Sequence, residues 1–145
     1  LGPDPLTKNF SFRYFKNFLN GKKKSIKDML MDQRCIAGLG NIYVNEILFK
    51  CKVKPTRKVN KLKDSEIKNI ITVTKKILKK AIIFGGSSIK NFANSSGKVG
   101  NFQQHFNVYG KKDSMCSNTD CNGFVRRIVI SNRASFFCTK CQKLT

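Results

Sequence analysis

The sequence has few acidic residues and no long apolar run. Only 8 of its 145 residues are Asp or Glu, against 29 Lys and Arg, so the formal net charge is +21. A balance of this size favours a polyanionic partner, either nucleic acid or an anionic membrane surface. No stretch approaches the roughly 18 to 20 apolar residues needed to span a bilayer, and no secretory signal opens the sequence. We therefore expect a cytoplasmic chain with no membrane partner.

The acidic residues are also unevenly distributed. None lies between Glu66 and Asp113, and none follows Asp120, so these two stretches hold much of the uncompensated positive charge. At any single lysine, a solvated surface is the better explanation. The chain is 40% hydrophobic and contains 12 Phe, a composition that can form a core and excludes a disordered basic tail.

Apolar periodicity predicts helices in the first part of the chain. An amphipathic helix is expected over residues 7–20, and a shorter one over residues 25–33. The turn Gly38-Leu39-Gly40 follows, and a further short helix has Asn41 at its N-terminus. This is a pair of short helices joined by a glycine-rich reversal.

A longer helix is expected to begin at Asp64 and to end at Gly85-Gly86. Carboxylates suit the positive N-terminal end of a helix, and glycine is the usual residue just past its C-terminal end. Residues 87–110 are rich in Ser, Asn and Gly and predict a long loop, of the kind that is often functional in compact domains.

Four cysteines near the C-terminus form two pairs. Cys116 and Cys121 form C-x4-C, Cys138 and Cys141 form C-x2-C, and 16 residues separate the pairs. Four thiolates on two tight turns can bind one zinc ion tetrahedrally, and closed coordination would make the metal structural because no position is left for water. Two disulfides are the alternative, which a reducing compartment disfavours.

The residues between the cysteine pairs predict a β-hairpin. Two strands are expected at 124–130 and 133–138, with a reversal near Ser131-Asn132, which completes a zinc ribbon. Cys35 and Cys51 lie outside this pattern, among apolar residues, and are expected to be buried packing residues.

A glycine turn between helices and a basic zinc hairpin together suit duplex binding by two separate contacts. Asn41 and the nearby backbone amides can hold a phosphate at a helix N-terminus. Arg133, near the hairpin tip, can reach a second phosphate or a groove.

The chain resembles the C-terminal half of the formamidopyrimidine-DNA glycosylases, bacterial bifunctional enzymes that remove oxidised purines. The helix-two-turns-helix motif also occurs in a small-subunit ribosomal protein and a topoisomerase, but not with this loop and ribbon. The family-like stretches are 1–6 (LGPDPL), 26–49 (IKDMLMDQRCIAGLGNIYVNEILF), 85–92 (GGSSIKNF), 97–110 (GKVGNFQQHFNVYG) and 133–143 (RASFFCTKCQK). The resemblance implies a mainly α fold with a small β zinc ribbon: a helix-two-turns-helix domain over 1–110 and a four-cysteine zinc finger over 111–145.

The resemblance also implies roles for individual residues. Asn41 matches the family's phosphate-binding Asn, and Lys23 and Lys27 match basic positions that contact DNA. Arg133 matches the zinc-finger Arg that binds the phosphates beside the lesion and donates a proton in the last elimination step. Residues 87–102 match the loop that closes over the flipped base, with Lys98 near that base.

The four cysteines match the family's zinc ligands, with one departure. The first pair is usually C-x2-C, whereas here Cys116 and Cys121 are separated by four residues. This lengthens the local turn, but C-x4-C still permits tetrahedral coordination.

The family's nucleophile is absent from this chain. In the family, an N-terminal proline amine attacks the sugar and is followed by Glu, whereas here residue 1 is Leu and Pro3 is acylated and not nucleophilic. We expect a separate N-terminal catalytic domain, without which the chain is inactive. The resemblance then implies a monomeric glycosylase/AP lyase acting on double-stranded DNA that contains 8-oxoguanine, formamidopyrimidines or abasic sites. The alternative is a non-catalytic module that recognises bent or damaged DNA, or structured RNA.

Overall fold

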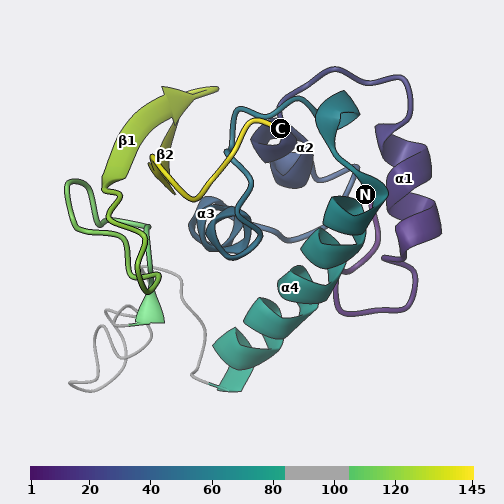
Figure 1. Cartoon of the computed structure of the whole chain (residues 1–145). Coiled ribbons are helices and arrows are strands. Elements are labelled where there is room, and N and C mark those ends of the chain that lie inside the picture. The colour runs from purple at the N-terminus through teal and green to yellow at the C-terminus, as the bar shows by residue number, and fades with distance from the viewer. Residues whose placement is uncertain (84–104) are drawn as a thin grey trace.

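The structure is a computed structural model that describes residues 1–83 and 105–145. Its elements are α1 (Phe12–Leu19), α2 (Ile26–Met31), α3 (Asn41–Lys50), a 3-10 turn (Val59–Lys61), α4 (Asp64–Ile83), β1 (Val125–Ile130) and β2 (Arg133–Cys138). The two strands form one antiparallel sheet that lies beside α3, while α1 lies on the other side of the helical part (Figure 1). The expected fold class, mainly α with a small β-hairpin, is confirmed.

Helix α1 begins later than the sequence suggested. Ser11 is its N-cap, and the Ser11 hydroxyl accepts a hydrogen bond from Tyr14 N at 3.2 Å. The preceding residues form turns, in which the Asp4 carboxylate accepts from Leu6 N at 2.8 Å. The expected helix over residues 7–20 was therefore wrong at its start, because local polar side chains satisfy the backbone in another way.

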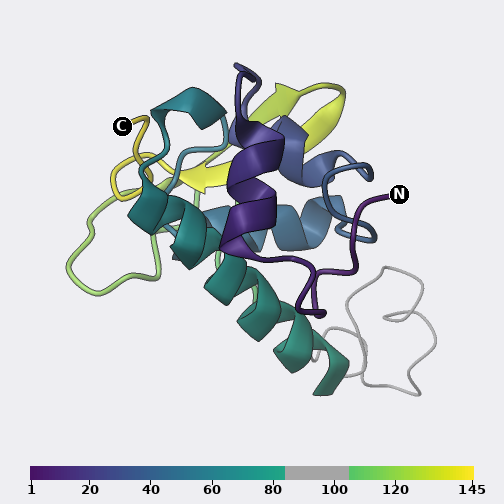
Figure 2. The ribbon, with the colours of Figure 1, turned by 90° about the vertical axis from the view of Figure 1, so that its right-hand side faces the viewer.

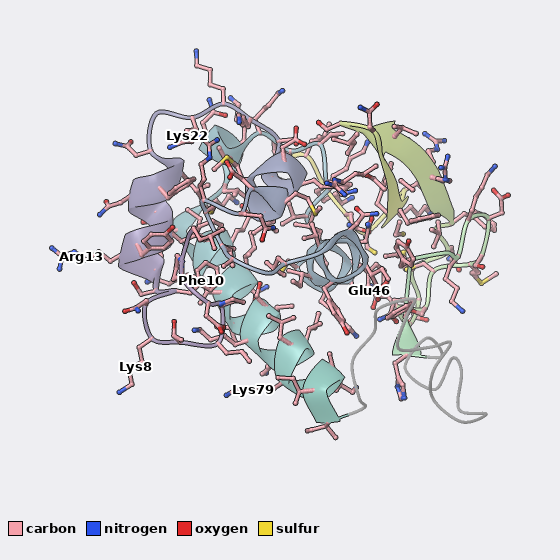
Figure 3. All side chains as sticks on the ribbon, turned by 180° about the vertical axis from the view of Figure 1, so that it is seen from behind. Lys8, Phe10, Arg13, Lys22, Glu46 and Lys79 are labelled. Carbon is pink, nitrogen blue, oxygen red and sulfur yellow. The ribbon has the colours of Figure 1, made fainter. Side chains whose placement is uncertain are left out.

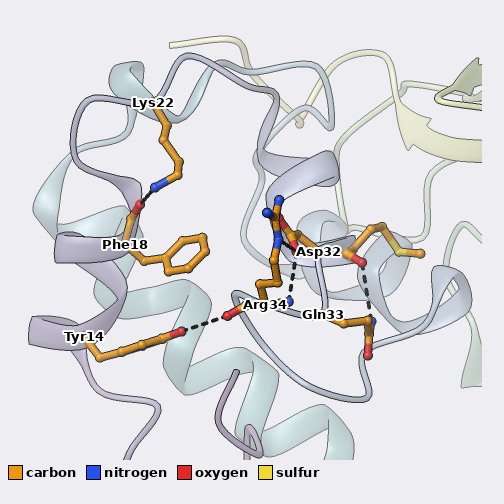
Figure 4. A network of polar contacts seen from close by, with 7 residues as sticks. Tyr14, Phe18, Lys22, Asp32, Gln33 and Arg34 are labelled. Carbon is orange, nitrogen blue, oxygen red and sulfur yellow. Dashed lines mark hydrogen bonds and ion pairs between the residues drawn. The ribbon is translucent and has the colours of Figure 1, made fainter. Parts of the chain in front are cut away.

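The reversal between α2 and α3 is held by contacts with α1. Tyr14 Oη donates to the Cys35 carbonyl at 2.6 Å and to the Arg34 carbonyl at 3.4 Å. Figure 4 shows the contact with Arg34, whose side chain pairs with Asp32 at 3.0 Å. Gly38 has φ +83°, a left-handed conformation that suits glycine. Helix α3 then begins at Asn41, which confirms the predicted turn and the predicted place of Asn41.

Helices α1 to α4 enclose the main core. Helix α4 crosses beside α1 and α3 (Figure 2) and buries one face, which comprises Ile67, Ile70, Ile71, Thr74 and Ala81. No helix in residues 1–83 or 105–145 is both long and apolar enough to cross a bilayer. The predicted end of α4 at Gly85-Gly86 lies outside the described residues, as do residues 87–104 of the predicted loop.

The two cysteines outside the metal pattern belong to this helical part. Cys35 is fully buried and Cys51 is partly buried, and both thiols are unpaired. Burial raises the pKa of each thiol to about 12, so both remain protonated and unreactive at neutral pH. This agrees with a packing role.

The hairpin reverses through two residues, as predicted. Ser131 and Asn132 have φ of +48° and +64°, the combination of a type I′ turn, and Ile130 pairs with Arg133 across it. The hairpin shares a second core with the helical part, made by Phe49, Val108, Cys116, Val125, Phe136 and Cys138. The division into 1–110 and 111–145 stays a prediction.

Candidate metal centre and nucleic-acid interface

Four cysteine sulfurs converge at the end of the hairpin opposite its turn. The Sγ atoms of Cys116, Cys121, Cys138 and Cys141 all lie within 4.8 Å of one another. The Cys116–Cys141 and Cys121–Cys138 pairs are 3.7 and 3.5 Å apart. Sulfurs bound tetrahedrally to zinc at about 2.3 Å lie about 3.8 Å from one another, whereas a disulfide is about 2.05 Å long. The geometry therefore fits a metal site and not the disulfide alternative.

Backbone N–H groups favour the thiolate form of Cys138, whereas burial raises the pKa of the Cys116 and Cys141 thiols. Lys140 N and Cys141 N each donate to Cys138 Sγ at 3.4 Å. Burial alone would raise the pKa of the Cys138 thiol, but these N–H groups and the neighbouring thiols lower it to about 7. Gly123 leaves room for the sulfur, since a Cβ there would lie 2.7 Å from Cys138 Sγ. Four sulfur ligands complete a tetrahedron, so a metal here would be structural.

The carbonyl oxygen of Ala134 joins the hairpin to the helical part. It accepts hydrogen bonds from Asn41 Nδ2 at 3.0 Å, Lys27 Nζ at 3.1 Å and Asn45 Nδ2 at 3.5 Å. We call this group of four residues the Ala134 joint. It places Arg133, the residue before Ala134, beside the N-terminus of α3. The two phosphate-binding candidates named from the sequence, Asn41 and Arg133, therefore lie at one place in the structure.

Lys27 is buried within this joint. Its side chain is only 1% exposed, and Nζ also donates to the Ser135 hydroxyl. Burial, followed by the positive charge of Arg133, lowers the pKa of Lys27 to about 8, against a smaller opposing effect of Asp28. In the protein alone, the ammonium group lies against the hairpin, and its expected contact with DNA stays a prediction.

The other expected DNA-binding residues are distributed differently. Lys23, just before α2, and Arg133, at the start of β2, are both exposed. Lys98 and the expected base-covering loop at 87–102 lie outside the described residues. The structure thus brings together Lys27, Asn41 and Arg133, whereas Lys23 is not one of the residues of the Ala134 joint.

Two buried polar residues of α3 were missed from the sequence. Asn45 accepts from Phe136 N at 2.6 Å and donates to the Asn41 carbonyl at 2.8 Å. The Glu46 carboxylate accepts from the backbone N–H groups of residues 107, 108 and 109 at 2.7, 3.0 and 2.8 Å. Figure 3 shows Glu46 on α3, on the side that faces this turn. Their occurrence in an otherwise apolar helical run was the available signal, because buried polar groups are retained where they have partners.

The C-terminal tail is a second attachment that was missed. Arg57 is 1% exposed, pairs with Glu66 at 2.5 Å and donates from Nε to the Lys143 carbonyl at 3.0 Å. Gln142 donates to the Val53 carbonyl at 2.9 Å. The segment that follows the last cysteine is therefore fixed to the helical part.

Comparison with known proteins agrees with this geometry. A family model described as the formamidopyrimidine-DNA glycosylase H2TH domain matches residues 1–93. The chain belongs to the formamidopyrimidine-DNA glycosylase family. Formamidopyrimidine-DNA glycosylases of Bacillus subtilis (strain 168) and Listeria monocytogenes serovar 1/2a are 44% and 42% identical to it over 143 residues. These alignments cover 98% and 99% of this chain but only 51% and 52% of the relatives. The chain spans about half the length of the curated relatives that it matches.

Solved structures of the family have the same fold. The Lactococcus lactis formamidopyrimidine-DNA glycosylase bound non-covalently to DNA with an abasic site matches with a TM-score of 0.86 and 38% identity, over 99% of this chain and 50% of that one. The same enzyme in complex with DNA that contains Fapy-dG matches with a TM-score of 0.86 and 38% identity, over 99% and 51%.

Proposed function

We propose that this chain is the damaged-DNA-binding portion of a bifunctional DNA glycosylase/AP lyase. The whole enzyme would remove oxidised purines such as 8-oxoguanine and formamidopyrimidines and then nick the abasic site. The Ala134 joint is the main structural support, because it places Asn41 and Arg133 together. Family membership and the DNA-bound relatives support the same assignment.

In this proposal, residues at and next to the Ala134 joint bind the DNA backbone beside the lesion. The Asn41 amide has two N–H donors, of which one is directed to Ala134, so the other can serve a phosphate oxygen. The exposed guanidinium of Arg133 supplies a charge-assisted contact next to it and would donate the proton in the last elimination step. Lys23 adds charge before α2, and Lys98 in the 87–102 loop would lie near the extruded base. Such contacts would help to offset the few kcal/mol needed to flip a base out of the duplex.

We propose Zn²⁺ as the ion held by Cys116, Cys121, Cys138 and Cys141. Sulfur-only donors at tetrahedral spacing are typical of structural zinc. Zinc there would hold both ends of the hairpin and thereby the start of β2. We further propose that the enzyme is a monomer and acts in the cytoplasm on chromosomal DNA.

The chemical step would need an amine from the catalytic domain of the same protein. Proline and glutamate at that domain's N-terminus would attack the sugar and assist the departure of the base. Borohydride reduction in the presence of an abasic duplex should therefore give a covalent complex with the full-length enzyme and none with this chain. A covalent complex formed by this chain would contradict the proposal that the nucleophilic amine belongs to the catalytic domain.

Selective binding tests the proposal directly. The affinity of the chain for an abasic duplex, the matched intact duplex and an RNA hairpin would be measured at one salt concentration, because the phosphate contribution depends strongly on salt. The abasic duplex should bind most tightly. Equal affinity for all three would favour a general nucleic-acid-binding module instead.

A further inference from the structure

A basic cavity lies on the outer side of the zinc hairpin, along the edge of β1 that faces away from β2. It is a cavity of about 350 Å³ whose lining includes Lys112, Asp113, Phe124, Arg126, Arg127 and Thr139. Three of these side chains are cationic and one is acidic. Arg133 begins the opposite strand beside Ile130, four residues along β1 from Arg126, a distance of roughly 13 Å along a strand. Ala134 pairs with Val129, but its carbonyl is directed to α2 and α3 and away from β1, so the cavity and the Ala134 joint lie on opposite edges of the hairpin.

Phe124 gives this cavity an aromatic surface. Its side chain is 55% exposed, and the neighbouring Met115, which bridges to it, is 67% exposed. An exposed aromatic ring among arginines is the combination that single-strand-binding proteins use, because every base has a π-face that can stack and every nucleotide has a phosphate.

The backbone of β1 offers a further donor at the same edge. On the side away from β2, Val125 N donates to the Ser114 carbonyl at 2.9 Å, and Asp113 N donates to the Val125 carbonyl at 2.8 Å. Alternate residues of a strand direct their N–H and C=O groups to the same edge, so the Arg127 N–H also points outward. Among the described residues, the pairing of the outer edge of β1 with residues 113–115 ends at Val125. The backbone N–H of Arg127 on that edge is therefore open to a ligand.

We propose that this cavity binds one unpaired nucleotide of a nucleic-acid strand. The base stacks on Phe124, and the phosphate is held by Arg126, Arg127 and the Arg127 N–H. The Asp113 carboxylate repels a phosphate at its end of the cavity, which directs the phosphate to the arginine end. Such a site would hold a single-stranded segment near the zinc hairpin, in addition to the duplex contact at the Ala134 joint.

The test uses the full metal-loaded chain and a labelled oligothymidylate at one salt concentration. Phe124→Ala should weaken single-strand binding by about 5- to 150-fold, which corresponds to the roughly 1 to 3 kcal/mol lost when a stacking aromatic is removed. Phe124→Tyr, which keeps the ring, should bind within about twofold of the parent chain. Because Phe124 is largely exposed, Phe124→Ala should fold normally, which unchanged circular dichroism and metal content would verify.

Two variants that each lose one positive charge distinguish binding at this cavity from diffuse electrostatic attraction. Arg126→Gln and Lys79→Gln each remove one positive charge, and Lys79 projects from α4 on a part of the surface away from the hairpin (Figure 3). Arg126→Gln should lower single-strand affinity at least about threefold more than Lys79→Gln. Equal losses for this pair, or unchanged binding by Phe124→Ala, would overturn the proposal.

Discussion

Asn41 contacts the hairpin at Ala134, the residue next to Arg133, although 91 residues lie between Asn41 and Arg133 in the sequence. Their proximity depends on Ala134, whose carbonyl oxygen accepts from two amide side chains and one ammonium group. Removal of one donor leaves the other two in place. Substitutions at Asn41 and Arg133 therefore test phosphate binding with little disturbance of the joint.

Asn41→Ala and Arg133→Ala should each weaken binding to an abasic duplex by about 1 to 3 kcal/mol, a range that spans ordinary and charge-assisted hydrogen bonds. Fluorescence anisotropy at fixed salt measures the effect. Lys79→Ala, which removes an exposed charge on α4, serves as the control and should change affinity much less. Unchanged binding by both variants would contradict the assignment of these two residues.

Lys27 should make duplex affinity depend on pH. Its pKa is lowered from 10.5 to about 8 by burial and by Arg133. A phosphate beside Arg133 would stabilise the charged form and raise this pKa, so binding takes up a proton when free Lys27 is neutral. Affinity should therefore fall as the pH rises through about 8, by at most about tenfold per pH unit for one proton. Below that pH, Lys27 is charged in both states and the dependence disappears.

A titration of duplex affinity from pH 6.5 to pH 9.5 would show this inflection. Lys27→Met should abolish it, whereas Lys79→Met should retain it. An inflection that persists in Lys27→Met would assign the proton to another group.

At the scale of elements, α3 holds the β1–β2 hairpin and the turn that precedes it at two places. Asn45 binds β2 through Phe136 N, and Glu46 binds the turn at residues 107–109, whose Tyr109 ring packs on Phe136 with centroids 5.3 Å apart. Because these contacts use backbone N–H groups, they set the position of the hairpin as well as adding stability. Helix α3 thus carries Asn41, the residue proposed to bind phosphate, and also supports strand β2, which begins at Arg133.

Glu46→Gln should destabilise the chain. The amide of glutamine can accept only some of the hydrogen bonds that the Glu46 carboxylate accepts from three backbone N–H groups. Each hydrogen bond to a charged group contributes about 1.5 to 3 kcal/mol. We expect the free energy of unfolding, measured by urea denaturation, to fall by about that amount. Asp120→Asn, at an exposed position with φ +64° that asparagine tolerates, should have little effect. A loss as small as that of Asp120→Asn would show that Glu46 does not hold the turn.

Local patterns in the sequence were sufficient for the helix pair, the hairpin turn and the cysteine cluster. Glycine at Gly38, asparagine at Asn132 and the cysteine spacing act over a few residues, so they can be identified without the fold. Asn45, Glu46 and Arg57 could not be interpreted in this way, because their partners lie far away in the chain. The start of α1 was misplaced for a different reason, since the Ser11 cap competed with a continuing apolar pattern.

On the scale of the whole molecule, the metal site and the C-terminal tail form one continuous attachment. Gln142 follows the last ligand directly, accepts from Cys138 N at 2.7 Å and donates to the Val53 carbonyl. The Lys143 carbonyl then accepts from Lys54 N at 2.9 Å and from Arg57 Nε at 3.0 Å. The position of the tail on the helical part consequently depends on the geometry at the cysteines.

Removal of the metal should therefore release the hairpin and lower duplex affinity. Binding of structural zinc contributes roughly 10 to 16 kcal/mol in small zinc domains, as much as the whole stability of a typical domain. Thermal unfolding followed by circular dichroism, with and without a chelator, should show a lower transition temperature after chelation. Elemental analysis should give one zinc per chain. A reduced, folded sample with no metal and an unchanged transition would contradict the assignment.

The Ala134 joint has a consequence for how this hairpin can vary. Its central acceptor is a main-chain carbonyl, which every amino acid has, so replacement of the residue at position 134 does not remove it. An insertion or deletion between Val125 and Ala134 would instead move that oxygen away from its donors and shift Arg133 with it. The turn from Cys116 to Cys121 lies outside this stretch. The two residues by which it exceeds a C-x2-C turn therefore do not change the register of the Ala134 joint. The length of the strands is thus constrained more strictly than their composition.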